Sequence, residues 1–201
     1  VALKLLHQAD AGQEERLRRE FLWLRRLRHA CLPEAYDFGK THDGRAYFTE
    51  RALIGRPLHE LPVDAPFELL HELVRQILDA LAYLHSRGIL HRDLKPSHLL
   101  WREPGPAAFV IDLGLAETIG GELQATAIGT PLYTAPEIAR GLRATPRSDL
   151  YSLGVVLYEV LSGQPPFQDP DPAVVLRMHL DGEAPPPRSR LQAPSAFLAF
   201  V

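Results

Sequence analysis

Two clusters of charged residues, each placed directly after an apolar run, constrain the fold of this chain more than any other feature. H-R-D-L-K at residues 91–95 follows the apolar residues 88–90, and Asp112-Leu113-Gly114 follows the apolar run at residues 107–111. A short apolar run that ends in a carboxylate predicts a buried strand with an acid at its end. Each cluster alone has a plain alternative, because Asp-Leu-Gly is a common turn and the first cluster could be a turn with a salt bridge.

The order of further segments decides between these interpretations. Residues 1–4 are V-A-L-K, residues 129–133 are G-T-P-L-Y and residues 135–137 are A-P-E. Together with the two clusters they resemble, in order and spacing, the V-A-I-K, H-R-D, D-F-G and A-P-E signatures of protein kinases. The tetrapeptide D-L-K-P at residues 93–96 resembles the serine/threonine branch of that family. The chain is therefore similar to a eukaryotic-like (Hanks-type) serine/threonine protein kinase catalytic domain.

The resemblance implies an α+β fold with the two lobes of a protein kinase, a small lobe rich in β-structure and a mainly helical large lobe. We expect residues 1–52 to form a partial small lobe with the hinge, and residues 53–201 to form a large lobe that is truncated at its C-terminus. The Gly-rich loop that covers ATP phosphates in the family is expected to precede Val1, and the family's last helices are expected to follow Val201.

Hydrophobic periodicity predicts the main elements. Strands are expected at residues 2–6, 36–39 and 46–49, and amphipathic helices at residues 13–28 and 67–84. Another helix, apolar nearly all round, is expected at about residues 150–161 with Asp149 at its start. In the family the matching Asp braces the backbone of the catalytic loop. An ordinary N-terminal helix cap is the alternative, and the two roles are compatible.

The resemblance also implies the roles of the catalytic residues. Asp93 would orient and deprotonate the acceptor hydroxyl, and Lys95 would neutralise charge on the migrating phosphoryl group. Thr130 belongs to the same catalytic set and fits the serine/threonine branch. The implied reaction is transfer of the ATP γ-phosphoryl group to Ser or Thr hydroxyls of protein substrates.

The phosphates of ATP are assigned to a lysine that pairs with a glutamate. Lys4 would hold the nonreacting phosphates, and Glu20, a carboxylate on the apolar face of the helix expected at residues 13–28, would be its partner. A carboxylate on an apolar face needs such a partner. The alternative is that Glu20 only flanks Arg16 on a solvated face.

The adenine side of the expected nucleotide site falls on the hinge. By resemblance Thr49 is the gatekeeper, and the backbone of Glu50 and Ala52 would bond the adenine edge. Leu100 completes the residues expected to bind the nucleotide.

The expected metal ligands are Asp112 and His98. In the family motif H-R-D-L-x-x-x-N an Asn binds magnesium five residues after the Asp, but this chain has His98 there. Magnesium prefers oxygen ligands and imidazole suits manganese better, so the implied cofactors are ATP with Mg²⁺ or with Mn²⁺. A pseudokinase that binds nucleotide or protein without turnover is the alternative. Against it stands the survival of the whole expected constellation, namely Lys4, Glu20, Asp93, Lys95 and Asp112.

Arg92 and Thr126 indicate regulation by phosphorylation. An Arg next to the catalytic Asp occurs in kinases whose activation loop is ordered by phosphate, and Thr126 occupies the position that usually receives it. We therefore expect phosphorylated Thr126 to be held in part by Arg92. The plain alternative for Thr126 is an exposed loop hydroxyl.

Composition excludes several other classes of function. The net charge of -3 and the pI near 6.3 argue against nucleic acid or an anionic membrane surface as the main partner. The basic run at residues 16–28 alternates with apolar residues at helical spacing, as on the wet face of an amphipathic helix. Cys31 is the only cysteine, which excludes an internal disulfide and fits a reducing, cytoplasmic setting. No apolar run reaches the roughly 18 residues of a membrane span.

Overall fold

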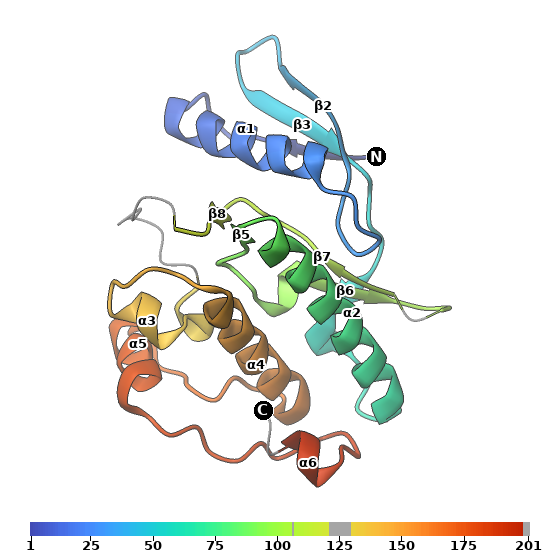
Figure 1. The fold of residues 1–201 in the computed structure, drawn as a ribbon, viewed down its shortest axis with the longest axis vertical. Helices are drawn as coiled ribbons and strands as arrows, with labels where there is room; N and C mark the ends of the chain where they lie inside the picture. The colour runs from blue at the N-terminus through green and yellow to red at the C-terminus, as the bar shows by residue number, and fades with distance from the viewer. Residues whose placement is uncertain (106, 121–129, 199–201) are drawn as a thin grey trace.

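The computed structural model describes residues 1–105, 107–120 and 130–198. Figure 1 shows two parts, a smaller one at the top with a sheet and one long helix, and a larger, mainly helical one below. The N-terminus lies in the smaller part, and the last described residues lie in the larger. This arrangement confirms the expected α+β, two-lobed fold.

The elements lie at or near their expected places. The smaller part contains β1 (Ala2–Leu5), α1 (Ala11–Arg26), β2 (Ala35–Lys40) and β3 (Ala46–Glu50). The strands of the larger part are β4 (Arg56–Pro57), β5 (Ile89–Leu90), β6 (Leu99–Arg102), β7 (Ala107–Val110) and β8 (Glu117–Thr118). Its helices are η1 (Leu58–Glu60), α2 (Phe67–Ser86), η2 (Pro96–His98), η3 (Pro131–Tyr133), α3 (Pro136–Ala139), α4 (Pro146–Ser162), α5 (Pro172–Asp181) and α6 (Ser195–Leu198). Only α4 begins well before its expected start.

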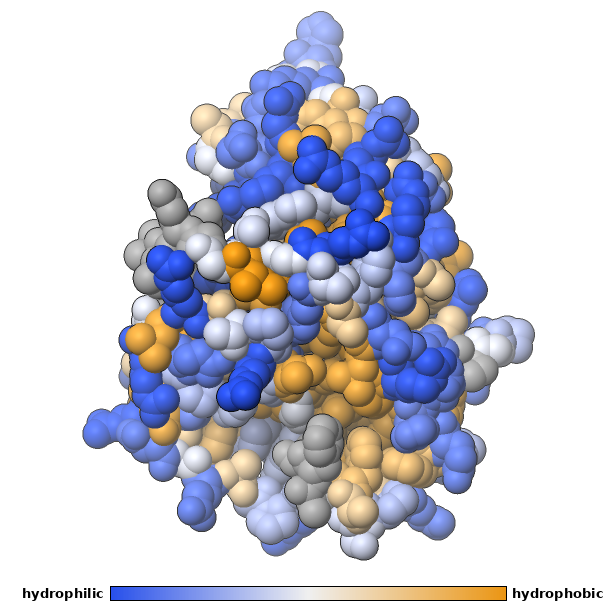
Figure 2. Space-filling model, in the orientation of Figure 1, coloured by the Kyte–Doolittle hydropathy of each residue, from blue (hydrophilic) through white to orange (hydrophobic). Residues whose placement is uncertain are grey.

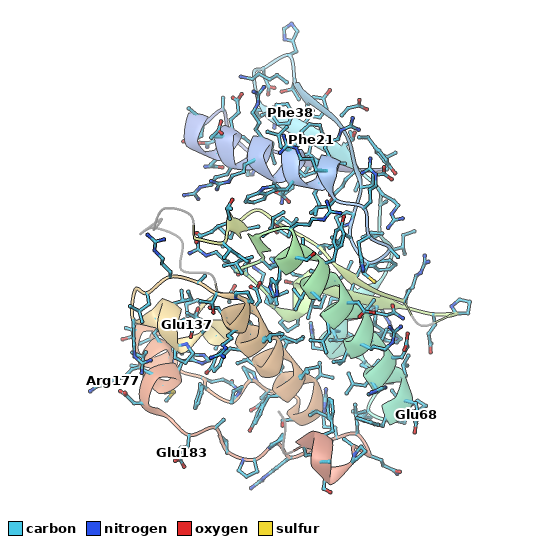
Figure 3. All side chains as sticks on the ribbon, viewed as in Figure 1. Phe21, Phe38, Glu68, Glu137, Arg177 and Glu183 are labelled. Atoms are coloured by element: carbon cyan, nitrogen blue, oxygen red, sulfur yellow. The ribbon has the colours of Figure 1, made fainter. Side chains whose placement is uncertain are left out.

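The two faces of the small sheet have different environments. Its strands are antiparallel in the order β1-β3-β2. One face packs against α1, where the ring of Phe21 lies 5.5 Å from that of Phe38 and 6.0 Å from that of Phe48 (Figure 3). The other face carries Leu3, which is 59% exposed. Because side chains alternate along a strand, a shift of one residue moves a side chain from the α1 face to the outer face.

Helix α1 places one carboxylate inside the smaller part. The helix begins after Asp10, whose side chain accepts a hydrogen bond from the amide of Gln13 at 2.7 Å, a normal N-cap. Its buried positions are Leu17, Glu20 and Leu24, which share the face toward the sheet. A buried carboxylate is costly without a partner, so the position of Glu20 requires a cation nearby.

Helices α2 and α4 supply most of the core of the larger part. The buried side chains of α2 are Leu70, Leu73, Val74, Ile77, Ala80, Leu81 and Leu84. Helix α4 begins with a capping box, in which Thr145 and Ser148 each bind the other's backbone amide. It ends at Gly163, whose φ of 84° is a left-handed conformation that favours glycine. These signals define the two ends of α4.

Short strands hold both ends of residues 91–98. β5 precedes this segment and pairs with β8, and β6 follows it and pairs with β4 and β7. The chain leaves β7 directly before Asp112, and the amide of Ile111 donates to the carbonyl of His98 at 3.0 Å. The two charged clusters of the sequence therefore lie side by side.

The apolar surface of the larger part lies between α2 and α4, as Figure 2 shows in the lower half of the view. A groove of about 340 Å³ there is lined by residues that include Leu78 and Leu150, which are 39% and 46% exposed. None of residues 91–98 lines this groove. Among the described residues, no helix combines the length and the hydropathy needed to cross a membrane.

Candidate active site

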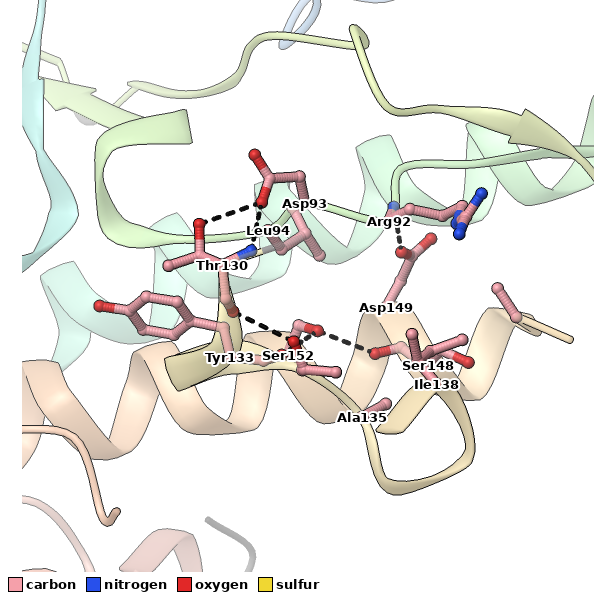
Figure 4. A pocket seen from close by; sticks show the side chains of 12 residues that line it. Arg92, Asp93, Leu94, Thr130, Tyr133, Ala135, Ile138, Ser148, Asp149 and Ser152 are labelled. Carbon is pink, nitrogen blue, oxygen red and sulfur yellow. Dashed lines mark hydrogen bonds between the residues drawn. The ribbon is translucent and has the colours of Figure 1, made fainter. Parts of the chain in front are cut away.

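Asp93, Lys95 and Thr130 meet at one point, although 35 residues separate the last two. One oxygen of Asp93, Oδ2, accepts from Lys95 Nζ at 2.9 Å. The other, Oδ1, accepts from the amide and the hydroxyl of Thr130 at 3.1 and 3.2 Å (Figure 4). Lys95 Nζ also lies 3.4 Å from Thr130 Oγ1. The three expected catalytic residues thus form one hydrogen-bonded cluster.

Asp149 holds the backbone that carries this cluster. Its side chain is 1% exposed and accepts from the amides of His91 at 3.0 Å and Arg92 at 2.9 Å (Figure 4). His85 Nε2 lies 2.8 Å from the same carboxylate. Arg92 has a φ of 67°, so these bonds hold a backbone conformation that is unfavourable for a side chain larger than glycine. The expected bracing role of Asp149 is confirmed, and Thr145 rather than Asp149 is the N-cap.

Lys4 joins the small sheet to α1 and to the second charged cluster. Its Nζ donates to both oxygens of Glu20 at 2.7 and 2.8 Å and to Asp112 Oδ1 at 2.8 Å. The expected pair with Glu20 is confirmed, and the alternative of a solvated Glu20 is wrong because that residue is only 2% exposed. Burial opposes the charge of Lys4, but the two carboxylates outweigh it and raise the pKa of the ammonium. Burial of Glu20 raises the pKa of its carboxyl.

Asp112 and His98 face each other across 3.3 Å, measured from Asp112 Oδ2 to His98 Nε2. His98 Nδ1 lies 2.8 Å from the carbonyl oxygen of Asp93 and must carry the proton there, because a carbonyl only accepts. Burial lowers the pKa of His98 and favours the neutral ring, in which Nε2 holds a lone pair. The pKa of Asp112 falls to about 2, since the charge of Lys4 overcomes the opposing effect of burial. A carboxylate oxygen and an imidazole nitrogen that point at the same space suit a divalent cation.

A cavity of about 270 Å³ brings the phosphate-side residues together. Its lining includes Lys4, Glu20, Asp93 and Asp112. The lining thus contains one ammonium and three carboxylates, and two of these carboxylates, Glu20 and Asp112, bond to the ammonium. The residues come from the smaller and the larger part, as a site between two lobes requires.

The side chain of Thr49 lies on the face of the small sheet away from Lys4, which corrects its expected role as the gatekeeper. In the β1–β3 ladder Lys4 is opposite Phe48, and Thr49 is opposite the exposed Leu3. The hydroxyl of Thr49 accepts from the amide of Asp37 at 3.1 Å on the outer side. The residue at the end of β3 whose side chain shares the face of Lys4 is Glu50, opposite Ala2. The error arose because a shift of one residue changes the face of the sheet.

The other expected hinge residues lie at the junction of the two parts. The carbonyl of Glu34 accepts from the amide of Arg51 at 2.8 Å, and the exposed Ala52 follows. Leu100 lies on β6 beside the same segment, since a Cβ added to Gly55 would come within 3.2 Å of Leu100 Cβ. Leu100 and the hinge segment are therefore adjacent.

Two partners in the site were missed from the sequence. Arg92 forms an ion pair with Glu117, and both side chains are largely buried, at 10% and 14% exposure. Glu117 lies in the two-residue strand β8, which is too short for periodicity to reveal. The orientation of Glu50 could have been found, because alternation within β3 places it on the same face as the fully buried Phe48. Thr126 and Gly129 lie outside the described residues.

Burial of Glu50 gives the stability of the protein a pH dependence. Burial raises the pKa of this carboxyl from 4.5 to about 7, assisted by the charges of Glu20 and Asp112. Between these values the folded protein binds more protons than the unfolded chain, so the free energy of unfolding falls as pH rises. We expect Glu50→Gln to remove this loss. Its free energy of unfolding, relative to that of the wild type, should rise by about 2 kcal/mol between about pH 5 and pH 8.

Urea unfolding of both proteins at the two pH values measures this difference. Glu183→Gln, at an exposed carboxylate, is the matched control and should show no such change. A stability difference between wild type and Glu50→Gln that does not vary with pH would contradict the expectation.

Comparison with known proteins agrees with this geometry. The sequence profile of the protein kinase domain matches residues 1–190. The serine/threonine-protein kinase pkn2 of Myxococcus xanthus is 36% identical over 203 residues, which cover 94% of this chain and 24% of that protein. The DNA damage-responsive serine/threonine-protein kinase RqkA of Deinococcus radiodurans is 38% identical over 198 residues, covering 94% and 30%.

A calcium/calmodulin-dependent protein kinase type 1 from Macrobrachium nipponense is 34% identical over 191 residues, covering 91% of this chain and 54% of that protein. The two-lobed fold and its site define a protein kinase domain. The chain belongs to the protein kinase family. It spans about a quarter to a half of the length of these curated relatives.

Proposed function

We propose that this chain is the catalytic domain of a serine/threonine protein kinase, which transfers the γ-phosphoryl group of ATP to Ser or Thr hydroxyls of protein substrates. The observation that carries the proposal is the Asp93 carboxylate held between Lys95 and Thr130, next to the Lys4, Glu20 and Asp112 cluster. Residues 1–52 serve as the small lobe with the hinge, and residues 53–201 as the large lobe.

Asp93 is the base for the acceptor hydroxyl. Oδ1 accepts two hydrogen bonds from Thr130, whereas Oδ2 accepts one from Lys95 and keeps a lone pair that can take the hydroxyl proton. The carboxylate is aimed by a backbone that Asp149 fixes, so little reorganisation is needed when the acceptor arrives. Asp93 therefore orients the nucleophile and removes its proton.

Lys95 and Lys4 supply positive charge on either side of the transfer. Lys95 lies 2.9 Å from Asp93 Oδ2, so its ammonium is adjacent to the position at which the acceptor loses its proton. Lys4, held by Glu20 on a rigid helix, is available to the nonreacting phosphates. An ammonium is a compact charge that suits this task.

A divalent cation fits the pair formed by Asp112 and His98. One carboxylate oxygen and one imidazole nitrogen converge there, and this mixed donor set suits manganese better than magnesium. When bound, the ion would neutralise charge on the phosphates. We propose Mg²⁺ or Mn²⁺ as the cofactor, with Asp112 and His98 as its ligands.

The alternative is a pseudokinase that acts as a nucleotide- or protein-binding regulatory module, because His98 replaces the catalytic-loop Asn of the family. The other expected residues of the site form the hydrogen bonds described above, which supports the kinase.

For location we propose the cytoplasm. The proposal is supported by Cys31, which is buried and present as a free thiol, a form typical of a reducing compartment.

Phosphoryl transfer from γ-labelled ATP to a general protein substrate, followed by phosphoamino acid analysis, tests the proposed function. The full-length protein that carries this domain should label Ser and Thr. Label confined to Tyr would overturn the acceptor class, and binding of ATP without any transfer under Mg²⁺ or Mn²⁺ would favour the regulatory module.

We also propose that Thr126 is phosphorylated and that the phosphate activates the kinase with the help of Arg92. The ion pair between Arg92 and Glu117 bears on this, because a carboxylate already neutralises the same guanidinium. A phosphate on Thr126 would either share the guanidinium of Arg92 with Glu117 or displace Glu117 from it. Glu117 should therefore make activity less dependent on Thr126.

We expect Thr126→Ala to lower turnover more strongly in a Glu117→Gln background than in the wild type. The coupling should be about 1 kcal/mol, or roughly fivefold in rate, as for groups that share one partner. A double-mutant cycle on kcat/KM measures it, with Thr118→Ala, at an exposed hydroxyl, as control. Additive effects, or phosphopeptide mapping that finds Thr126 unmodified in the active enzyme, would refute the expectation.

A further inference from the structure

His179 is a buried histidine for which the proposed reaction has no use so far. It lies near the end of α5, whose buried residues are Val175 and His179, and only 4% of its surface is exposed. Helix α5 packs against α3, beside which Figure 1 shows it, and against η3, the turn that directly follows Thr130. The imidazole of His179 therefore lies between a surface helix and the segment that bonds to Asp93.

Both ring nitrogens of His179 form hydrogen bonds. Nε2 lies 3.1 Å from the carbonyl oxygen of Leu132 in η3 and must carry the proton there, because a carbonyl only accepts. Nδ1 then accepts from the hydroxyl of Tyr151 on α4 at 2.7 Å. This arrangement requires a neutral ring, which burial favours because it lowers the pKa of His179. One ring thus joins α5 to both α4 and η3.

Two aromatic rings fix the orientation of this imidazole. The ring of Phe167 lies 5.0 Å from that of His179 at an angle of 80°, and the ring of Tyr151 lies 5.6 Å away at 68°. Both are edge-to-face contacts, which are favourable for aromatic pairs. With its plane held in this way, the Nε2 proton points at the carbonyl of Leu132.

The turn that His179 holds has few bonds of its own. Inside η3 the carbonyl of Thr130 accepts from the amide of Tyr133 at 3.0 Å. The carbonyl of Tyr133 accepts from Ser152 Oγ at 2.6 Å, so it bonds to α4. The carbonyl of Leu132 bonds to His179 on α5. Because a single 3₁₀ turn is weak by itself, these side-chain donors contribute strongly to where it lies.

We propose that His179 is a positioning residue for phosphoryl transfer, which holds η3 through the carbonyl of Leu132 and so keeps Thr130 in place against Asp93. Thr130 is two residues from Leu132 and donates to Asp93 through both its amide and its hydroxyl, at 3.1 and 3.2 Å. A displacement of η3 would weaken both bonds at once and leave the carboxylate poorly aimed at the acceptor. This inference rests on the proposed function and deepens it, because it adds a residue that acts through Thr130.

Methionine and glutamine at position 179 separate the hydrogen bond from the packing. Both side chains are unbranched and similar in size, but only that of Gln can donate to the carbonyl of Leu132. The full-length protein is compared as wild type, His179→Met and His179→Gln, with His59→Met, at an exposed histidine, as the control.

Two kinds of measurement are made on these four proteins. The first is kcat and KM for a general protein acceptor and KM for ATP, with turnover expressed per ATP-binding site so that unfolded molecules do not enter it. The second is hydrogen exchange of the amides of Thr130 and Tyr133, which reports on the order of η3 without turnover.

We expect His179→Met to lower kcat about tenfold and to speed exchange of both amides, while KM for ATP stays unchanged. His179→Gln should restore most of both effects, and His59→Met should match the wild type. Equal kcat and equal exchange in His179→Met and His179→Gln would overturn the proposal. Loss of ATP binding in His179→Met would also overturn it, because His179 would then only support the fold. A wild type that transfers no phosphoryl group would instead overturn the proposed function.

Discussion

Replacement of Asp93 by Asn is expected to lower phosphoryl transfer by about 10²- to 10⁴-fold, the range that a positioned general base contributes. Asn keeps the size of the side chain and an oxygen that can accept from Lys95 or Thr130, so the local hydrogen bonds survive in part. It cannot take the proton of the acceptor hydroxyl. Binding of ATP should remain largely intact, because Lys4 and Asp112, which would hold the phosphates and the cation, are untouched.

Single-turnover phosphoryl transfer and equilibrium ATP binding, measured on the same preparations, separate these effects. Asp79→Asn is the matched control, since Asp79 is an exposed carboxylate on α2 that pairs with Arg75 at the surface. It should leave both measurements unchanged. If Asp93→Asn turned over at the wild-type rate, Asp93 would lose its assigned role.

The parts of the site that the sequence predicted depend on motif order and on single strong partners. Lys4 with Glu20 was predictable because a carboxylate on an apolar helix face needs a cation, and the first motif of the chain offers one. The bracing role of Asp149 was implied by the resemblance to protein kinases, whereas its position at the start of an apolar helix by itself suggested a helix cap, which is Thr145. In both cases the local pattern left an alternative open, and the resemblance to the kinase family indicated the partner that the structure shows.

The parts that were missed depend on strand register and on very short strands. The inner residue at the hinge is Glu50 rather than Thr49, because side chains alternate along β3 and Glu50 shares the face of the buried Phe48. The pair of Arg92 with Glu117 spans 25 residues and depends on the two-residue ladder between β5 and β8. Such contacts are determined by the packing of the whole domain, and the local sequence pattern holds no information on that packing.

His98 is the feature on which the kinase and the regulatory module differ most. Its Nδ1 is held by the carbonyl of Asp93, and this bond points Nε2 toward Asp112. The orientation is that of a ligand whose second nitrogen is fixed by the protein, as in metal sites where a hydrogen bond sets the tautomer. An imidazole that only filled space in the core would not require Nε2 to be oriented toward Asp112. The geometry therefore supports retained but altered use of the metal.

Replacement of His98 by Asn is expected to raise Mg²⁺-supported turnover of the full-length protein by about 10- to 100-fold, by analogy with other changes around metal ligands. The amide supplies the oxygen that magnesium prefers, whereas the wild-type nitrogen suits manganese, so the wild type should turn over faster with Mn²⁺. Titration of phosphorylated product with each ion, together with Mn²⁺ binding followed by electron paramagnetic resonance, measures both effects. His59→Asn, at an exposed histidine, should change neither. If turnover neither rises in His98→Asn nor is faster with Mn²⁺ in the wild type, the regulatory module is favoured. In a domain that does not catalyse phosphoryl transfer, restoring one metal ligand would not raise turnover.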